Sequence, residues 1–252
     1  MRLTFLGTGN AGNVPNYGCD CPACERAITD PTHRRLSACA LVENGNGAHL
    51  MIDAGLPNIA DLFPPGSLHT ILLTHFHMDH VHGLFPIRWG SNIGIEVIGP
   101  DDPVGSDDLF KHPGVLDFSQ KAQAFETFDN QGFTITPVPL NHSRPTLGYV
   151  FEHQDKTLAY LTDTVGLPAE TENWLLQRTI DTLVLDCSFP PSDKMPKGHN
   201  DLNSALATIA KIKPAKAYLT HISHELDTWF MSNSEALPDN VLVASDKLSI
   251  NF

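Results

Sequence analysis

The stretch His75-Phe76-His77-Met78-Asp79-His80 decides the fold prediction, and it directly follows the apolar run Ile71-Leu72-Leu73-Thr74. It places three imidazoles and one carboxylate within one turn. Histidine is the commonest metal ligand, and imidazole with carboxylate suits Zn, Mn or Fe better than Ca. Because four such groups exceed what one open catalytic metal usually takes from one loop, the spacing predicts two adjacent metal ions. Such pairs recur in enzymes that cleave phosphoesters and amides.

Four apolar runs in the chain end in a residue that can bind a metal. The runs cover residues 71–74, 138–141, 159–162 and 217–220, and the residues that follow them are His75, His142, Asp163 and His221. Groups at adjacent strand ends can converge on one crevice, so we expect these four to meet there. A fifth run ends in Asp186, which either orients a metal ligand or is an ordinary turn residue.

Composition and charge limit the class of protein. The chain has 252 residues, of which 41% are hydrophobic and 18% charged, as in one large or two small globular domains. A net charge of −13 disfavours a nucleic-acid partner, although metals could still supply positive charge for a small phosphorylated substrate. We find no run near the ~18 apolar residues of a membrane span, and the N-terminus does not resemble a signal peptide. We therefore expect a cytoplasmic protein without a membrane partner.

Strand-like runs alternate with turns throughout the chain. Strands are predicted over residues 1–6, 38–42, 49–52, 70–73, 96–98, 133–140, 148–152, 157–161, 182–185, 216–219 and 241–243. The second and third should form a hairpin. Helices are predicted over residues 79–89, 169–177 and 202–211, the last capped by Asn200 or Asp201. This order predicts a sheet-rich α/β domain in several layers.

The cysteines predict a second kind of metal site. Cys19, Cys21 and Cys24 lie within six residues, and a chain of this size does not need disulfides. Thiolates select Zn among common ions, although a reactive or merely buried cysteine set is the alternative. Cys39 and Cys187 are expected in the core, with Cys39 a candidate fourth ligand.

The ordered set His75-x-His77-x-Asp79-His80, His142, Asp163 and His221 resembles the two-metal members of the metallo-β-lactamase superfamily. The stretches Leu6-Gly7-Thr8-Gly9 and Ile52-Asp53-Ala54-Gly55 fit it too, so the resemblance covers nearly the whole chain. It implies an α/β fold, a single-domain αββα sandwich over residues 1–252. Two sheets would pack face to face with helices outside.

A narrower resemblance links the chain to the PhnP-type phosphoribosyl cyclic phosphodiesterases of the carbon–phosphorus lyase pathway. It rests on residues 18–24, 83–90, 108–114 and 220–224. The resemblance implies one metal on His75, His77 and His142, another on Asp79, His80 and His221, and Asp163 as the bridge. The ions would be two Mn²⁺, although the sequence also permits Zn²⁺ or Fe²⁺. It further implies a homodimer, and His224 as the fourth ligand of a structural Zn²⁺ in a loop at about 16–30.

The same resemblance implies a reaction in phosphonate catabolism. The substrate would be a small phosphorylated sugar, 5-phospho-α-D-ribosyl 1,2-cyclic phosphate, opened to ribose 1,5-bisphosphate. His199 matches the family's catalytic histidine and would protonate the leaving oxygen, while Asp79 could act on the proton of the attacking water. Arg88, Arg144 and Lys197 are candidates for binding the 5-phosphate, and each is otherwise an ordinary exposed cation.

The sequence leaves three other functions open. An RNA-processing nuclease of the same superfamily is disfavoured by the charge and by the lack of a basic RNA-gripping arm. A lactone or thioester hydrolase is compatible with the metal motif, but the cysteine loop and the His199 segment favour phosphodiesters. A non-enzymatic binding protein would not require seven aligned ligands.

Overall fold

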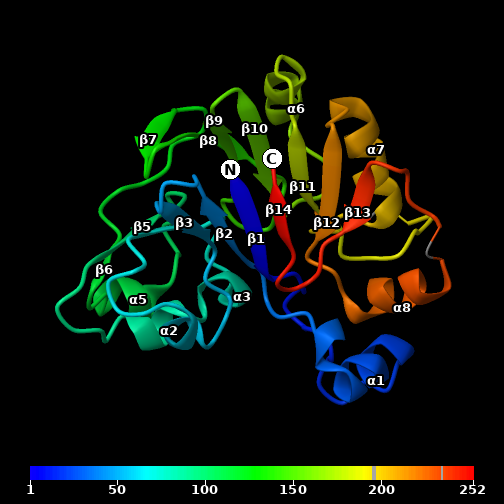
Figure 1. Ribbon diagram of the computed structural model, residues 1–252, viewed down its shortest axis with the longest axis horizontal. Coiled ribbons are helices and arrows are strands. Elements are labelled where there is room, and N and C mark those ends of the chain that lie inside the picture. Colours follow the sequence, from blue (N-terminus) through cyan, green and yellow to red (C-terminus); the bar gives the residue numbers. More distant parts are fainter. Residues whose placement is uncertain (195–196, 234) are drawn as a thin grey trace.

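The computed structural model describes residues 1–194, 197–233 and 235–252. Two sheets pack face to face, and helices cover their outer sides (Figure 1). This arrangement confirms the predicted αββα sandwich. No helix in the described ranges has the length and apolar character that crossing a membrane requires.

The first sheet has the strand order β14-β1-β2-β3-β4-β5-β6. Its strands are β1 (Arg2–Gly7), β2 (Cys39–Glu43), β3 (His49–Ile52), β4 (Thr70–Leu72), β5 (Ile95–Ile98), β6 (Leu116–Asp117) and β14 (Ser249–Asn251). Strands β2 and β3 pair antiparallel with Val42 opposite Leu50, which confirms the predicted hairpin. From β3 to β6 the strands run parallel.

The second sheet has the order β13-β12-β11-β10-β9-β8-β7. Its strands are β7 (Phe128–Asn130), β8 (Phe133–Pro139), β9 (Leu147–His153), β10 (Lys156–Leu161), β11 (Thr182–Asp186), β12 (Lys216–Thr220) and β13 (Val241–Val243). Strands β10 to β13 run parallel, and β9 is antiparallel to both β8 and β10. The carboxyl ends of β8, β10, β11 and β12 therefore lie at one edge of the sheet.

The helices that the structure describes are mostly short. They are α1 (Pro22–Thr29), α2 (Ile59–Leu62), α3 (Met78–Val81), α4 (Leu84–Ile87), α5 (Asp107–Lys111), α6 (Ala169–Leu176), α7 (Leu202–Ile212) and α8 (His224–Ser232), with a 3₁₀ turn at Pro31–His33. Helices α6 and α7 match the prediction to within one residue at each end. Asp201 caps α7 by accepting a hydrogen bond from the Ser204 amide.

The single helix predicted over residues 79–89 is wrong, because this segment forms two short helices, α3 and α4. Pro86 has no N–H to donate to the turn before it, so a continuous helix would lose a backbone hydrogen bond there. Gly83, between the two helices, packs so closely that an added Cβ would lie 2.2 Å from the Leu56 carbonyl oxygen. The break brings the chain against the loop after β3.

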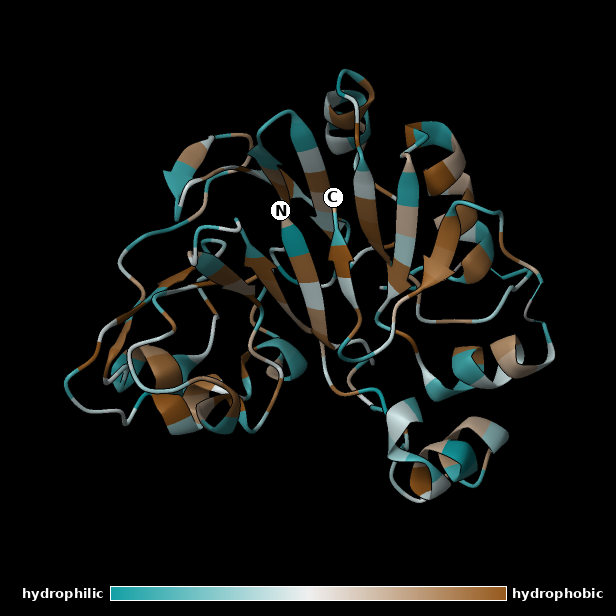
Figure 2. Cartoon of the chain, viewed as in Figure 1, coloured by the Kyte–Doolittle hydropathy of each residue, from teal (hydrophilic) through white to brown (hydrophobic). Residues whose placement is uncertain are grey.

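Both faces of the central strands are buried. In β10, Leu158 and Tyr160 pack between the two sheets, while Ala159 and Leu161 pack under the outer helices. This two-sided burial explains the nearly continuous apolar runs of the sequence, and Figure 2 shows β11 largely in the hydrophobic colour. The Tyr149 hydroxyl donates a 2.7 Å hydrogen bond to the Leu73 carbonyl, which joins the two sheets close to the end of β4.

Candidate metal centre

Three histidines form the first group of the candidate metal centre. His75 and His77 lie in the loop after β4, and His142 lies after β8. The Nδ1 atom of His77 is 2.9 Å from Nε2 of His75 and 3.0 Å from Nε2 of His142. Ring nitrogens that converge in this way form a group that can hold one ion.

A second group combines two histidines with two carboxylates. The Oδ2 atom of Asp163 lies 3.2 Å from Nε2 of His80 and 3.4 Å from Nε2 of His221. The Oδ2 atom of Asp79 lies 3.5 Å from Nε2 of His221. Asp163 also lies 3.6 Å from Nε2 of His75, so its carboxylate stands between the two groups. All seven residues predicted for the active site are thus brought together at one edge of the sandwich.

The rings of four of these histidines are held by hydrogen bonds at their outer nitrogens. In each case the outer nitrogen is Nδ1. His75 Nδ1 lies 3.0 Å from Thr74 Oγ1, and His80 Nδ1 lies 2.8 Å from Asp53 Oδ2. His142 Nδ1 lies 2.9 Å from the Gly198 carbonyl oxygen, and His221 Nδ1 lies 2.9 Å from Ser188 Oγ. With Nδ1 occupied, each ring presents Nε2 to the centre. Such outer partners fix the tautomer and orientation of metal-binding histidines.

The donor set fits a divalent transition metal. Burial lowers the pKa of His75 well below its usual range, so its ring is neutral and can donate a lone pair. Although burial opposes it, the Asp163 and Asp53 carboxylates raise the pKa of His80, which shows how much negative charge surrounds this ring. Nε2 of His80 is buried and forms no well-aligned hydrogen bond among the described residues, although Asp163 Oδ2 lies 3.2 Å away. A bound cation would satisfy this nitrogen and offset the buried carboxylates.

His199 lies beside the second group, on the segment before α7. Its Nδ1 is 2.8 Å from Asp186 Oδ2, and its ring stacks on His221 with centroids 4.7 Å apart. Although burial lowers it, the Asp186 carboxylate raises the pKa of His199 to about 9. The sequence left open whether Asp186 orients another side chain or is an ordinary turn residue. In the structure it orients His199. Asp186 also accepts from the Thr164 amide, so its orientation is fixed.

The cysteine group lies between α1 and α8. Cys19 Sγ and Cys21 Sγ are 3.4 and 3.5 Å from Nδ1 of His224, and Cys24 completes a set of four that could hold an ion. Although burial raises it, a hydrogen bond from Thr228 lowers the pKa of Cys21 to about 6, while burial raises that of Cys24 to about 12. Cys39 lies apart, buried with its Sγ 3.3 Å from the Asp53 carbonyl oxygen, so it is not the fourth ligand.

Two of the three cations predicted to bind a substrate phosphate have structural partners. Arg88 forms a 2.7 Å ion pair with Asp108, and only 10% of its side chain is exposed. Arg144 pairs with Asp102 at 2.8 Å and also donates to the Phe76 carbonyl, which lies between His75 and His77. Lys197 is exposed, two residues from His199.

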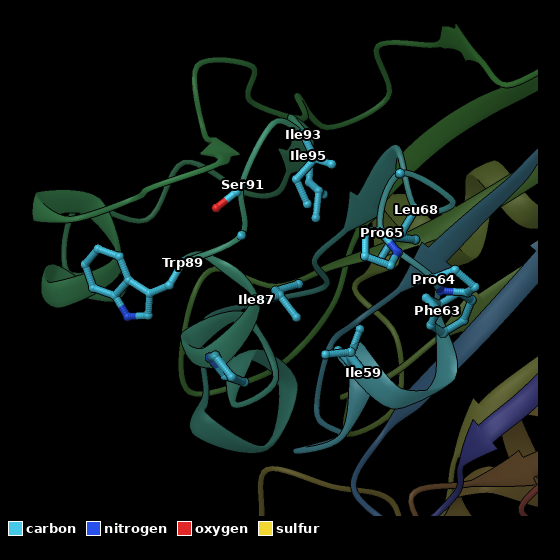
Figure 3. A pocket seen from close by; sticks show the side chains of 14 residues that line it. Ile59, Phe63, Pro64, Pro65, Leu68, Ile87, Trp89, Ser91, Ile93 and Ile95 are labelled. Atoms are coloured by element: carbon cyan, nitrogen blue, oxygen red, sulfur yellow. The ribbon is translucent and has the colours of Figure 1, made fainter.

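A separate apolar pocket lies on the outer side of the first sheet, between α2 and α4 (Figure 3). Ile59, Phe63, Leu68, Ile87 and Ile93 are among its lining residues, and its volume is about 380 Å³. None of the residues that line it has an acidic or basic side chain. This pocket therefore lacks the groups that acid, base or metal chemistry requires.

Sequence reasoning missed the groups that orient the metal-binding rings. Asp53 ends the apolar run 50–52 in the same way as His75 and Asp163 end theirs, so the same signal could have found it. It accepts hydrogen bonds from the amide and the hydroxyl of Thr74 as well as contacting His80. Ser188, two residues after Asp186, has no comparable sequence signal.

Replacing Asp53 by asparagine is expected to weaken binding at the second group by about 10- to 100-fold, because His80 loses the carboxylate that orients it. Competition with a chelator for bound Mn²⁺ measures the dissociation constant. Asp201→Asn is the control, since Asp201 is also buried and accepts two backbone N–H groups, those of Ser192 and Ser204, but contacts no member of either group. Equal Mn²⁺ affinity in Asp53→Asn and Asp201→Asn contradicts the prediction.

Comparison with known proteins agrees with this architecture. A family model described as a β-lactamase superfamily domain matches residues 51–222. Among solved structures, a diphosphatase described as belonging to the PhnP family superposes with a TM-score of 0.82 at 27% identity, covering 100% of this chain and 98% of that one. The Zn²⁺-bound PqqB from Methylobacterium extorquens covers both chains fully with a TM-score of 0.81, but at 20% identity it supports the fold alone.

A curated relative described by a different activity matches across almost the whole chain. It is an octanoyltransferase from Porphyromonas gingivalis, 26% identical over 268 residues, which include 98% of this chain. The match takes up 51% of that protein, so the chain spans about half the length of this relative.

Proposed function

The chain belongs to the β-lactamase superfamily, and on that basis we propose that it is a metal-dependent hydrolase of phosphodiester bonds. The observation that carries this proposal is the pair His199–Asp186 at the edge of the second metal group. A protonated imidazole beside a metal pair suits a reaction whose leaving oxygen needs a proton.

In the proposed mechanism, His75, His77 and His142 would hold one divalent ion, Asp79, His80 and His221 the other, and Asp163 would bridge them. When bound, such ions lower the pKa of a water and neutralise charge on phosphoryl oxygens. His199 uses Nδ1 to donate to Asp186, so its Nε2 is the free donor for the leaving oxygen. Asp186 keeps the ring protonated and oriented, and Asp79 would accept the proton of the attacking water.

The resemblance noted in the sequence favours 5-phospho-α-D-ribosyl 1,2-cyclic phosphate as the substrate and Mn²⁺ as the ion. Of the three candidate cations we then assign the 5-phosphate to Lys197, because Arg88 and Arg144 already hold carboxylates. A homodimer and a structural Zn²⁺ on Cys19, Cys21, Cys24 and His224 belong to the same proposal.

A diphosphate is the second candidate substrate, because the structurally similar PhnP-family protein is described as a diphosphatase. Both reactions break a phosphorus–oxygen bond, and His199 would serve either leaving group. A nuclease role is disfavoured by the net charge of −13.

One experiment tests the proposal, namely elemental analysis and a substrate panel on the same preparation. The panel includes bis(p-nitrophenyl) phosphate, the ribosyl cyclic phosphate, ADP-ribose, p-nitrophenyl phosphate, a lactone and a thioester. We expect Mn²⁺-stimulated turnover of diesters, or of the diphosphate, with little turnover of the monoester. Faster turnover of the lactone or thioester than of every phosphorus substrate contradicts the proposal.

A further inference from the structure

A mostly buried chain of alternating charges links α1, α8 and the loop after β1. Asp227 of α8 accepts from Arg26 of α1 at 2.8 Å and from Arg35 at 3.1 Å. The Arg35 guanidinium also donates to Thr8 Oγ1 at 3.0 Å, and the Thr8 hydroxyl donates in turn to Asp246 at 2.6 Å. The Asp227 side chain is only 5% exposed and that of Arg35 11%. None of these residues takes part in the proposed reaction.

The segment that Asp227 anchors carries one member of each metal group. His221, of the active-site group, directly follows β12, and His224, of the cysteine group, begins α8. Ser223 lies between them and caps α8, its hydroxyl accepting from the Leu226 amide at 3.2 Å. A shift of α8 would therefore move both histidines together.

The backbone of His221 depends on its surroundings. Its φ angle is +63°, a left-handed conformation that residues other than glycine adopt only when neighbouring contacts hold them there. The next residue, Ile222, donates from its amide to the Thr8 carbonyl at 2.8 Å. Because Arg35 also bonds to the Thr8 hydroxyl, the charge chain holds the Thr8 end of this contact directly. It reaches the Ile222 end only through α8, where Arg35 pairs with Asp227.

The cysteine loop is attached to the same anchor. Helices α1 and α8 lie side by side (Figure 1), and α1 begins directly after Cys21 and contains Cys24. The Ala23 amide donates to Thr228 Oγ1 at 3.3 Å, and the Thr228 hydroxyl bonds to Cys21 Sγ at 3.3 Å. Arg26 then adds the ion pair to Asp227.

We propose that Asp227 is a positioning residue that holds the active site and the cysteine group as one unit, so that neither group keeps its metal affinity when α8 is released. This rests on the proposed function, because both groups must bind metal. Asp227 touches no metal-binding atom in the described structure and acts through His221 and His224.

Titration of the whole protein with Co²⁺ tests the proposal. Sulfur-to-cobalt charge-transfer absorption reports the cysteine group, and d–d bands without it report the histidine and carboxylate groups. Asp227→Asn is expected to raise the Co²⁺ dissociation constants of both by about tenfold, at the low end of effects for residues outside the ligand shell. Asp181→Asn is the control. Asp181, directly before β11, also pairs with a cation and accepts a backbone N–H, from Lys156 and Thr157 at the start of β10.

A lower melting temperature of Asp227→Asn with unchanged Co²⁺ affinity at both groups would overturn the proposal. Loss of stability alone is the result expected if Asp227 has only a structural role. Arg26→Gln removes only one partner, which is 29% exposed, and it keeps the test valid if Asp227→Asn does not fold. It should weaken the cysteine group more than the active site, and equal affinity to the unmodified protein counts against the proposal. Failure of the unmodified protein to bind Co²⁺ refutes the proposed function instead.

Discussion

Replacing Asp163 by asparagine is expected to remove most of the activity, on the order of 10³-fold in kcat/KM, a loss of about 4 kcal/mol of transition-state stabilisation. Asp163 lies within 3.6 Å of His75, His80 and His221, so one carboxylate serves both metal groups. Asparagine keeps the shape but removes the charge that would hold two cations close together. The measurements are Mn²⁺ content by elemental analysis and kcat/KM for bis(p-nitrophenyl) phosphate.

Asp201→Asn is the matched control for this variant. Asp201 is as deeply buried as Asp163, but it caps α7 and belongs to neither metal group. Because asparagine is also a good helix cap, this control should keep its metal and its activity. Full Mn²⁺ content together with full activity in Asp163→Asn would show that Asp163 is not a bridge.

The sequence predicted the fold well because two of its patterns, the apolar runs and the turn residues of the hairpin, were clear. The apolar runs mark strands buried on both faces, and the hairpin at 38–52 has clear turn residues between its strands. Helix α8 was missed although Leu226, Trp229 and Phe230 have helical spacing and Ser223 is a cap. The polar residues between these positions hid that pattern.

The candidate site was predictable to the extent that its residues end strands. His142, Asp163 and His221 could be placed near one another because the carboxyl ends of neighbouring strands share an edge. The contact between Asp227 and Arg35 could not be predicted, since 192 residues separate them and neither follows a strand-like run. The bond between Ser188 and His221 likewise depends on how two loops pack, which no local pattern encodes.

Replacing His199 by glutamine is expected to affect substrates in proportion to how much their leaving group needs a proton. Hydrolysis of the ribosyl cyclic phosphate, whose leaving group is an alkoxide, should fall by about 10²- to 10⁴-fold. Hydrolysis of bis(p-nitrophenyl) phosphate should change little, because p-nitrophenolate leaves without protonation. The measurement is the ratio of kcat/KM for the two substrates in each variant.

The pKa of His199 adds a pH test of the same role. A general acid works in its protonated form, and the Asp186 carboxylate raises the pKa of His199 to about 9, so turnover of the cyclic phosphate should fall as the pH rises through about 9. In Asp186→Asn the charge that raises this pKa is gone, and the fall should begin at lower pH. The activated diester should show neither effect in either protein.

Equal losses for both leaving groups in His199→Gln would mean that His199 only shapes the site, because removing a proton donor must penalise the alkoxide more than the phenolate.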